Sequence, residues 1–390
     1  MRQKVLLKWQ ASNFFGWGIL GQNLFERWAS DPGIQPVMAV KIDPMHFQCI
    51  DPLRMALMQA ATAASNEFLD ELTAGKANLQ QLGVVTIDAL GSAFAPNVQG
   101  HFGARNVARC IFENTRMENS QRLEQYDELL CASEWNAGLL RSISNKPLKM
   151  IHEGIDHSQF FPGPKTGLLD PSRFYVFSGG KIEFRKAQDL VIFAFREFAR
   201  RHPDAVLVAA WNSPWPEFSV GYQANLQAPL RRDDTGKLEM RRWVTENGIH
   251  PSQFINLPMI PNSLLPMVLR QMDCALQVSR CEPCTNLPAM EAMACGVPVI
   301  LAHNTGMRDL IDTDNCLALR SQHRVNAIEP DLGTEGWGES DVEEIVAALE
   351  RLYTDTQLRK RIGARGAEWI LERGRTWRDH AAALKSHLFD

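Results

Sequence analysis

Two glutamates that flank a predicted turn carry the strongest chemical signal in the chain. Glu282 and Glu291 follow an apolar stretch at 274–278, expected to be a buried strand, and an alanine- and methionine-rich helix is expected to begin near Leu287. Open α/β sheets bind ligands at such strand-to-helix junctions, because the first N–H groups of the helix lack partners and attract anions. Glutamates at that place accept hydrogen bonds from hydroxyls. The segment therefore predicts a ligand with phosphate and polyol parts, such as a nucleotide sugar.

The two glutamates differ in how much explanation they need. A carboxylate near a helix start, such as Glu291, is stabilised by the helix dipole and requires no ligand. Glu282 lies between two cysteines directly after the buried strand, where an unpaired carboxylate would be costly. Glu282 is therefore expected to have a partner.

A basic turn lies between the first strand and the first helix of the second half of the chain. It contains Lys181, Arg185 and Lys186 within six residues. The helix dipole disfavours each cation by about 0.3–1 kcal/mol at a surface position, so three of them favour a compensating anion, for which a diphosphate is suited. The alternative is a solvated basic turn paired with neighbouring carboxylates, Glu183 and Asp189.

Three glycines after the first predicted strand have the G-x-G-x-x-G spacing of a dinucleotide fingerprint, at Gly16, Gly18 and Gly21. The bulky Trp17 between them and the long loop before them argue against a nicotinamide site. Glycines at a helix start also let the backbone approach any phosphate or sugar closely. A third interpretation is a tight turn that needs small residues for packing of the helix on the sheet.

The composition is that of an ordinary two-domain globular protein. The 390 residues are 45% hydrophobic and carry a net charge of −4, which gives no basic field and makes nucleic acid an unexpected partner. No apolar run approaches the roughly 20 residues that span a bilayer, and charge interrupts the start of the chain, so we expect a cytoplasmic protein. Peripheral membrane contact remains compatible with the sequence.

Eight cysteines are scattered along the chain, and Cys281 and Cys284 form a Cys-x-x-Cys pair. A zinc site needs a second ligand pair at suitable spacing, and a thioredoxin-like motif needs to open the first helix of a small domain. Neither context is present. We therefore expect no metal and no redox use of this pair.

Alternating strand and helix patterns predict two doubly wound parallel sheets. Strands are expected at 5–8, 37–40, 84–90, 129–132 and 148–151, and then, after a linker near 160–165, at 174–178, 206–210, 254–257, 274–278 and 298–301. Helices of the second half are expected at 187–201, 237–247, 263–272 and 288–295, and the last 50 residues are expected to be helical. The fold class is therefore α/β.

Several sequence blocks, spread over nearly the whole length, resemble the retaining GT-B glycosyltransferases of group 1, a family with glycogen synthase-like and mannosyltransferase-like members that use nucleotide-sugar donors. The blocks are Gly16-Trp-Gly-Ile-Leu-Gly-Gln-Asn-Leu, Cys131-Ala-Ser-Glu-Trp-Asn, Ile151-His-Glu-Gly-Ile-Asp with Phe161-Pro-Gly-Pro, Gly179-Gly-Lys-Ile-Glu-Phe-Arg-Lys-Ala, and Glu282 with Glu291-Ala-Met-Ala-Cys-Gly-Val-Pro-Val-Ile. The resemblance implies two Rossmann-like domains that face a central cleft. The acceptor-side domain would span 1–158 with a returning helix at 375–390, and the nucleotide-sugar domain would span 159–374.

The resemblance also implies roles for individual residues. Lys181 and Lys186 resemble the basic pair that holds the donor diphosphate, with Arg185 as a neighbour. Glu282 resembles the carboxylate that contacts the donor sugar, and Glu291 the one that binds the ribose. One more residue separates these glutamates than is usual in the family. The remaining implied site residues are the backbone N–H groups of Thr285, Asn286 and Leu287, the glycine turn at Gly16 and Gly18, and two candidates near the donor sugar, His101 and Glu113.

The implied reaction is glycosyl transfer with retention, without a covalent enzyme nucleophile and without a metal or other cofactor. The leaving diphosphate would take the acceptor proton while the lysines and the helix start stabilise its charge. The acceptor is a glycan, a lipid or a small molecule. The alternatives on the same architecture are a sugar-nucleotide epimerase, a phosphorylase and a catalytically silent scaffold.

Overall fold

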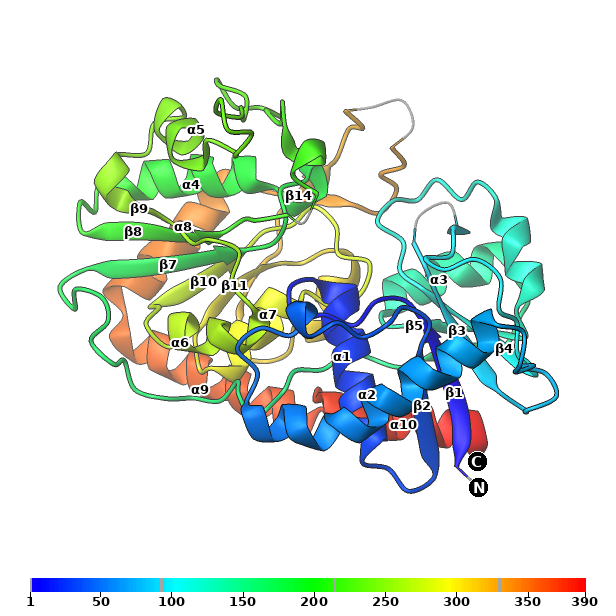
Figure 1. Ribbon diagram of the computed structural model, residues 1–390. Coiled ribbons are helices and arrows are strands. Elements are labelled where there is room, and N and C mark those ends of the chain that lie inside the picture. Colours follow the sequence, from blue (N-terminus) through cyan, green and yellow to red (C-terminus); the bar gives the residue numbers. More distant parts are fainter. Residues whose placement is uncertain (1, 92–93, 214, 329–331) are drawn as a thin grey trace. The chain divides into compact units, whose positions relative to one another are not determined.

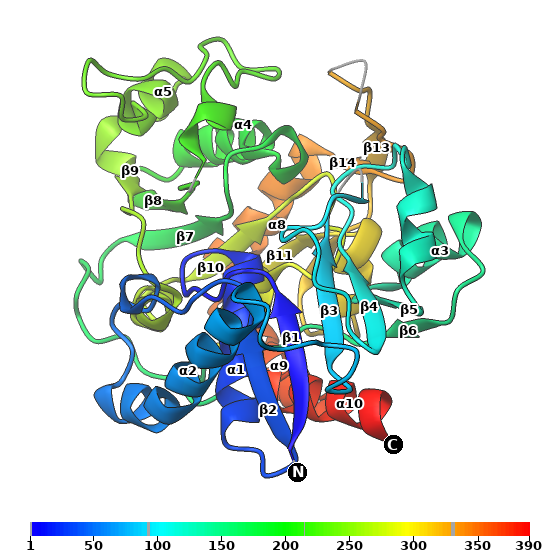
Figure 2. The same cartoon turned by 45° about the vertical axis from the view of Figure 1, so that its right-hand side comes forward.

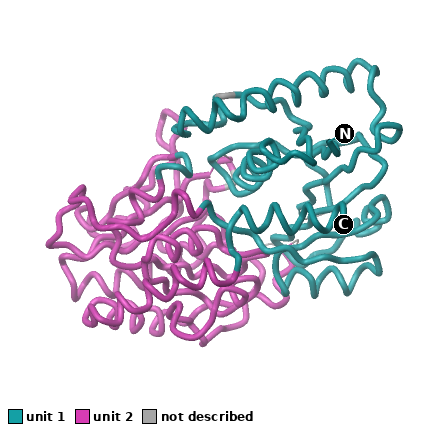
Figure 3. Tube along the Cα trace, turned by 90° about the horizontal axis from the view of Figure 1, so that it is seen from below, with its two compact units in different colours: residues 1–156, 261–264, 374–390 teal, residues 157–260, 265–373 magenta. Residues whose placement is uncertain are grey.

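Two compact units make up the chain in the computed structural model, which describes residues 2–91, 94–213, 215–328 and 332–390. Unit 1 comprises residues 1–156, 261–264 and 374–390, and unit 2 comprises residues 157–260 and 265–373 (Figure 3). Both chain ends therefore belong to unit 1. The short insertion at 261–264 joins it through the hydrogen bond from the Asn262 N–H to the Asn13 carbonyl oxygen (2.7 Å).

Unit 1 is built around a parallel six-stranded sheet in the order β2-β1-β3-β4-β5-β6. Figure 2 shows β1, β3 and β4 side by side. The strands are β1 (Gln3–Lys8), β2 (Ile34–Met38), β3 (Val85–Leu90), β4 (Arg105–Cys110), β5 (Glu128–Cys131) and β6 (Leu148–Met150). The helices within residues 1–156 are α1 (Gly16–Ala29), α2 (Pro52–Thr73) and α3 (Glu134–Ile143). Helices cover both faces of such a sheet, so its central strands are largely buried, as the fully buried Val5, Leu6 and Leu7 of β1 show.

The last helix, α10 (Trp377–Phe389), packs on unit 1 although it follows unit 2 in the sequence. Trp28 of α1 donates a hydrogen bond from its Nε1 to the Ala381 carbonyl oxygen (3.2 Å), and Lys385 pairs with Asp31 (2.7 Å). The backbone of Ile155 exchanges hydrogen bonds with the segment that leads into α10. Residues 374–390 are thus part of unit 1.

Unit 2 repeats the design with a second parallel six-stranded sheet, in the order β12-β11-β10-β7-β8-β9 (Figure 1). Its strands are β7 (Phe174–Gly179), β8 (Ala205–Ala210), β9 (Phe254–Asn256), β10 (Cys274–Gln277), β11 (Val299–Ala302) and β12 (Leu317–Leu319), and a small antiparallel pair joins β13 (Gln322–Arg324) to β14 (Gly338–Ser340). The helices are α4 (Gln188–Ala199), α5 (Met240–Glu246), α6 (Leu265–Leu269), α7 (Leu287–Ala294), α8 (Val342–Thr354) and α9 (Thr356–Glu372).

The core of unit 2 lies between its sheet and helices α4 and α8. Phe195 and Phe198 of α4 are fully buried, as is Leu349 of α8. Because β7 and β10 are neighbouring parallel strands, the loops that follow them emerge at the same edge of the sheet. These loops contain the basic turn and Glu282. Within the described part of the chain, no helix is long and apolar enough to cross a membrane.

Candidate functional site

Glu282, in the loop after β10, is a buried carboxylate that collects hydrogen bonds from two neighbouring loops. Its side chain is 4% exposed. Lys186 Nζ lies 2.7 Å from Oε1 and 2.9 Å from Oε2, and Arg185 Nη1 donates to Oε2 at 3.1 Å. Ser279 Oγ and Asn286 Nδ2 donate to Oε1 at 2.7 and 3.0 Å. The partner that the sequence required for Glu282 is therefore the basic turn itself.

These contacts set the ionisation of Glu282. Burial alone would raise the pKa of its carboxyl group, because a charge is costly in a medium of low dielectric constant. The charges of Lys186 and Arg185 outweigh that effect and, together with the hydrogen bonds, hold the pKa below its ordinary value. Glu282 is thus a carboxylate at neutral pH, fixed between two cations.

The basic turn is a short 3-10 helix at Phe184–Lys186 that precedes α4, and Ala187 joins the two with a left-handed φ of 57°. Arg185 also pairs with Glu183 (3.0 Å), and Lys181 pairs with Glu183 (2.5 Å). The anion that the three cations require is therefore supplied within the protein by Glu183 and Glu282. The alternative pairing of the turn with Glu183 agrees with these contacts, whereas the pairing with Asp189 is wrong.

Asp189 instead belongs to a buried network beneath the basic turn. Its two oxygens accept from Arg280 at 2.9 and 2.7 Å, and both side chains are fully buried. The Arg280 guanidinium also stacks over Phe184, 4.3 Å from its ring centroid, and the Arg280 N–H donates to the Arg185 carbonyl oxygen (2.7 Å). Arg280 therefore ties the loop of Glu282 to the basic turn. No pattern in the sequence around Arg280 indicates this role.

A second support of the Glu282 loop comes from the segment after β11. The backbone N–H of Glu282 donates to Thr305 Oγ1 (2.8 Å), and the Gly306 N–H donates to the Glu282 carbonyl oxygen (2.8 Å). A Cβ atom at Gly306 would collide with the carbonyl oxygen of Cys284. Only glycine fits this close approach of backbone to backbone. The sequence did not reveal Gly306, because nothing local distinguishes it from an ordinary turn glycine.

The start of α7 presents backbone N–H groups beside Glu282. The side chain of Asn286 caps the helix by accepting from the Ala289 N–H (3.0 Å). Within the residues that the structure describes, no acceptor lies within hydrogen-bond reach of the N–H groups of Asn286 and Leu287. Thr285 precedes them and is buried. Such N–H groups at a helix start favour an anion.

Glu291 is the fifth residue of α7 and is 4% exposed. It therefore lies beyond the first turn, where the helix dipole stabilises a carboxylate most. The dipole alone does not explain its presence. The role of Glu291 toward a ligand stays a prediction.

The predicted site residues of the first half lie in unit 1. Gly16 and Gly18 are in the first turn of α1, where a Cβ atom on Gly18 would come within 2.6 Å of Ser12 Cβ, and one on Gly21 within 2.7 Å of Trp9 Nε1. Close packing of α1 thus accounts for Gly18 and Gly21. His101 lies between β3 and β4 with a left-handed φ of 59°, and Glu113 follows β4. The roles of Gly16, Gly18, His101 and Glu113 toward a ligand stay predictions.

Comparison with known proteins confirms the resemblance that the sequence blocks indicated. Residues 164–329, which supply most of unit 2, match the family of glycosyl transferases group 1. A GDP-mannose-dependent α-(1-6)-phosphatidylinositol monomannoside mannosyltransferase of Mycolicibacterium smegmatis is 26% identical over 245 residues. That match covers 61% of this chain and 55% of the relative, so it spans about half of the relative's length.

Solved structures show that the two-sheet arrangement is the GT-B fold. The sucrose-phosphate synthase of Thermosynechococcus elongatus superposes with a TM-score of 0.67 at 15% identity, covering 99% of this chain and 98% of that protein. HepE of Anabaena, in complex with UDP and glucose, superposes with a TM-score of 0.64 at 13% identity, covering 99% of both chains. The chain therefore has the GT-B fold, and residues 164–329 of its second half are similar to group 1 glycosyl transferases.

Proposed function

We propose that this chain is a glycosyltransferase that takes a sugar from a nucleoside diphosphate sugar bound by unit 2. The observation that carries this proposal is the cluster of Lys186, Arg185 and Glu282 beside the start of α7, in a segment that matches group 1 glycosyl transferases. The mycobacterial relative is named for its use of GDP-mannose, and the Anabaena protein was solved with UDP and glucose. Both names support a nucleotide-sugar donor.

In this proposal the donor diphosphate lies against Lys186, with Lys181 and Arg185 as neighbouring cations and the N–H groups of Asn286 and Leu287 as further donors. Guanidinium and ammonium groups and helix starts are the protein groups best suited to phosphate oxygens. The cations are already held by carboxylates, so their charges need little rearrangement when the donor binds. Thr285 contributes its backbone N–H at the same place.

The two glutamates take the hydroxyls of the donor. We assign the ribose hydroxyls to Glu291. We assign to Glu282 both the orientation of Lys186 and the acceptance of hydrogen bonds from the transferred sugar. The low pKa of Glu282 supports this role, because a carboxylate accepts such bonds and a carboxylic acid does so less well.

The proposed reaction retains the configuration at the anomeric carbon. The bond between that carbon and the β-phosphate oxygen breaks, and its electron pair stays on the diphosphate. The acceptor oxygen forms its bond on the same face through an oxocarbenium-like state, and its proton passes to the leaving phosphate oxygen. The cations of unit 2 stabilise the negative charge that develops on the diphosphate.

Four residues of unit 1 complete the proposal. His101 and Glu113 are our candidates for contact with the transferred sugar, and the glycine turn at Gly16 and Gly18 for close approach to phosphate or acceptor. The acceptor is a glycan, a lipid or a small molecule. The family match does not favour an epimerase, a phosphorylase or a silent scaffold.

Nuclear magnetic resonance of the purified chain with GDP-mannose or UDP-glucose tests this function directly. Glycosyltransferases hydrolyse their donors slowly when water replaces the acceptor, so we expect release of nucleoside diphosphate and free sugar from one of the two donors. The first anomer formed should have the configuration that the sugar had in the donor.

Three results would contradict the proposal in different ways. Formation of an epimeric nucleotide sugar would identify the reaction as epimerisation and not transfer. A first product of opposite anomeric configuration would show that the reaction inverts the configuration. Absence of turnover with both donors and with a wider panel of nucleotide sugars would remove the assignment as a transferase.

A further inference from the structure

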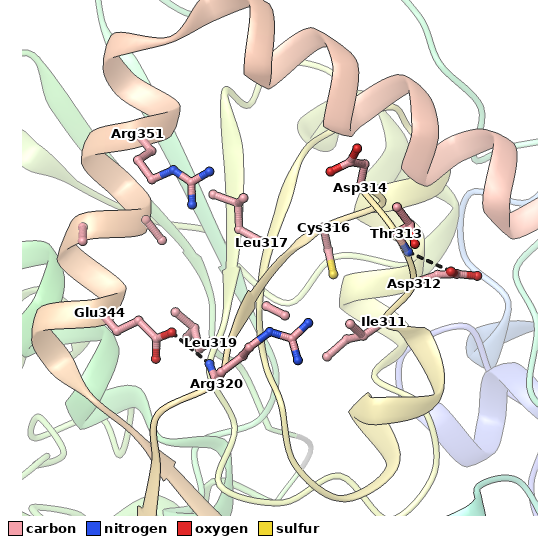
Figure 4. A pocket seen from close by; sticks show the side chains of 13 residues that line it. Ile311, Asp312, Thr313, Asp314, Cys316, Leu317, Leu319, Arg320, Glu344 and Arg351 are labelled. Atoms are coloured by element: carbon pink, nitrogen blue, oxygen red, sulfur yellow. Dashed lines mark hydrogen bonds between the residues drawn. The ribbon is translucent and has the colours of Figure 1, made fainter.

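A pocket of unit 2 lies between the edge strand β12 and one face of α8, and its lining includes none of the residues of the Glu282 cluster. Its volume is about 420 Å³. Cys316, Leu317 and Leu319 line it from β12 and the residues before it (Figure 4), and Ala348 lines it from α8. Pockets of about 300–1,000 Å³ hold small organic ligands. The pocket is large enough for a phosphorylated sugar of five or six carbons.

Two arginines extend into this pocket from different elements. Arg320 follows β12 and Arg351 belongs to the last turn of α8, and both side chains line the pocket (Figure 4). Within the described residues, neither guanidinium lies within 4.0 Å of a carboxylate oxygen. The dipole of α8 favours a cation at the position of Arg351, but it does not account for Arg320.

Two of the carboxylates that line the pocket are committed to other partners. Glu344 accepts from the backbone N–H groups of Arg320 and Ser321, both at 2.9 Å. Asp312 accepts from Arg373 (2.6 Å) and from Trp369 Nε1 (3.0 Å). The cations of the pocket are therefore not neutralised by its own acidic residues.

Glu344 also occupies backbone groups just past the end of the edge strand. An edge strand adds a further strand through its unpaired backbone groups. Here Glu344 occupies the N–H groups of Arg320 and Ser321 at the end of β12. A small anion therefore fits the pocket better than an added peptide strand.

The positive charge of Arg320 also acts on His303, which does not line the pocket. Burial lowers the pKa of His303, and the charges of Arg320 and Arg308 lower it further. Asp314 lines the pocket, is exposed, and has a left-handed φ of 58°. The pocket thus combines cations for an anion with a carboxylate that suits hydroxyls.

We propose that this pocket is a second ligand site that binds the phosphate monoester of a small polyol or sugar. Arg320 and Arg351 bind the phosphate group, Asp314 accepts hydrogen bonds from the hydroxyls, and the aliphatic wall contacts the carbon skeleton. A doubly charged phosphate matches two guanidinium groups in charge and in the fork geometry of their hydrogen bonds.

Calorimetric titration with ribose 5-phosphate, with ribose as the uncharged control, tests this site. We compare the wild type with the double variant Arg320→Gln and Arg351→Gln, with Arg361→Gln as an exposed arginine of α9, and with Lys186→Ala. Ribose 5-phosphate should bind the wild type, Arg361→Gln and Lys186→Ala alike. The double variant should bind at least tenfold more weakly, with an unchanged circular dichroism spectrum, and ribose should not bind.

The Lys186→Ala titration separates this site from the proposed donor site. Equal affinity in the wild type and the double variant would overturn the proposal, and so would the absence of binding to the wild type at about 10 mM ligand. Loss of binding in Lys186→Ala would assign the phosphate to the basic turn and would equally overturn it.

Discussion

At the scale of single residues, the central feature is that one buried carboxylate holds two cations. Glu282 orients both Lys186 and Arg185, and each of the three side chains is largely shielded from water. Charges fixed in this way are positioned before a ligand arrives, so little energy is lost in reorganising them. Removing Glu282 should therefore disturb the cations as well as the sugar contacts.

The variant Glu282→Gln should show a pH-dependent loss of stability. At pH 7 it leaves Lys186 and Arg185 buried without their shared charge, and we expect a decrease of about 3 kcal/mol in the free energy of unfolding. The folded-state pKa of Glu282 is lowered, so its stabilisation is complete above the pKa of the unfolded carboxyl group, about 4, and is lost as the pH falls through the folded pKa.

Urea unfolding of both proteins at pH 7, 5 and 3 measures this effect. The difference between wild type and variant should shrink at pH 3. Glu197→Gln, an exposed member of ion pairs with Arg196 and Arg200, should change little at any pH. A Glu282→Gln difference of equal size at all three pH values would show that the ion pairs do not stabilise the fold.

At the scale of elements, the glycines of α1 test whether packing or ligand binding fixes their identity. Ala at Gly18 would place its Cβ atom 2.6 Å from Ser12 Cβ, so Gly18→Ala should lower the free energy of unfolding by about 1–3 kcal/mol. Gly138 lies within α3, where an added Cβ atom would meet no neighbouring atom within 4 Å, so Gly138→Ala should raise that free energy by about 0.5–1 kcal/mol.

Urea unfolding of the two alanine variants measures these opposite changes. A Gly18→Ala protein as stable as the wild type would show that α1 has room for a side chain. In that case close approach of a ligand, and not packing, would be the better explanation of the glycine.

Most strands were predictable from the sequence because their apolar runs are continuous, as in β7 and β10. The strand β4 was missed, because Arg105, Asn106 and Arg109 interrupt its apolar pattern although Arg109 is buried. The helix α2 was also missed, since its apolar and polar residues are poorly segregated. Element boundaries depend on caps such as Asp51 and on tertiary contacts that single-residue preferences do not contain.

The candidate site was predictable as a set of residues but not as a set of contacts. The basic turn and Glu282 are close in space because β7 and β10 are neighbouring strands, which the sequence order does not reveal. The direct pairing of Lys186 with Glu282 and the supporting roles of Arg280 and Gly306 all arise between segments about 20–100 residues apart. Long-range contacts of this kind require the folded sheet.

At the scale of the whole molecule, the segment 374–390 belongs to unit 1 although it follows unit 2 in the sequence. Trp377 is the first residue of α10 and is 2% exposed. Its loss removes packing within unit 1 that residues 374–390 contribute. We expect Trp377→Ala to lower the stability of unit 1 by about 3–5 kcal/mol. The exposed neighbour Arg378 provides the control variant Arg378→Ala, which should behave like the wild type.

Hydrogen exchange followed by mass spectrometry locates this effect. Exchange should accelerate in peptides from β1 and β3 of unit 1 in Trp377→Ala, while peptides from β7 and β10 of unit 2 keep their protection. Equal acceleration in both units would show that α10 stabilises the whole chain and not unit 1 alone.

Calorimetric titration of nucleotide sugars into the wild type and three variants tests the central claim that unit 2 binds the donor at the basic turn and α7. With GDP-mannose and UDP-glucose as ligands, at least one should bind the wild type. Lys186→Ala and Glu291→Gln should each weaken that binding at least tenfold, which corresponds to about 1.4 kcal/mol. Lys165→Ala, which removes a half-exposed lysine paired with Asp273 in the same unit, should leave it unchanged. Donor affinity equal to that of the wild type in both Lys186→Ala and Glu291→Gln would contradict the assigned site.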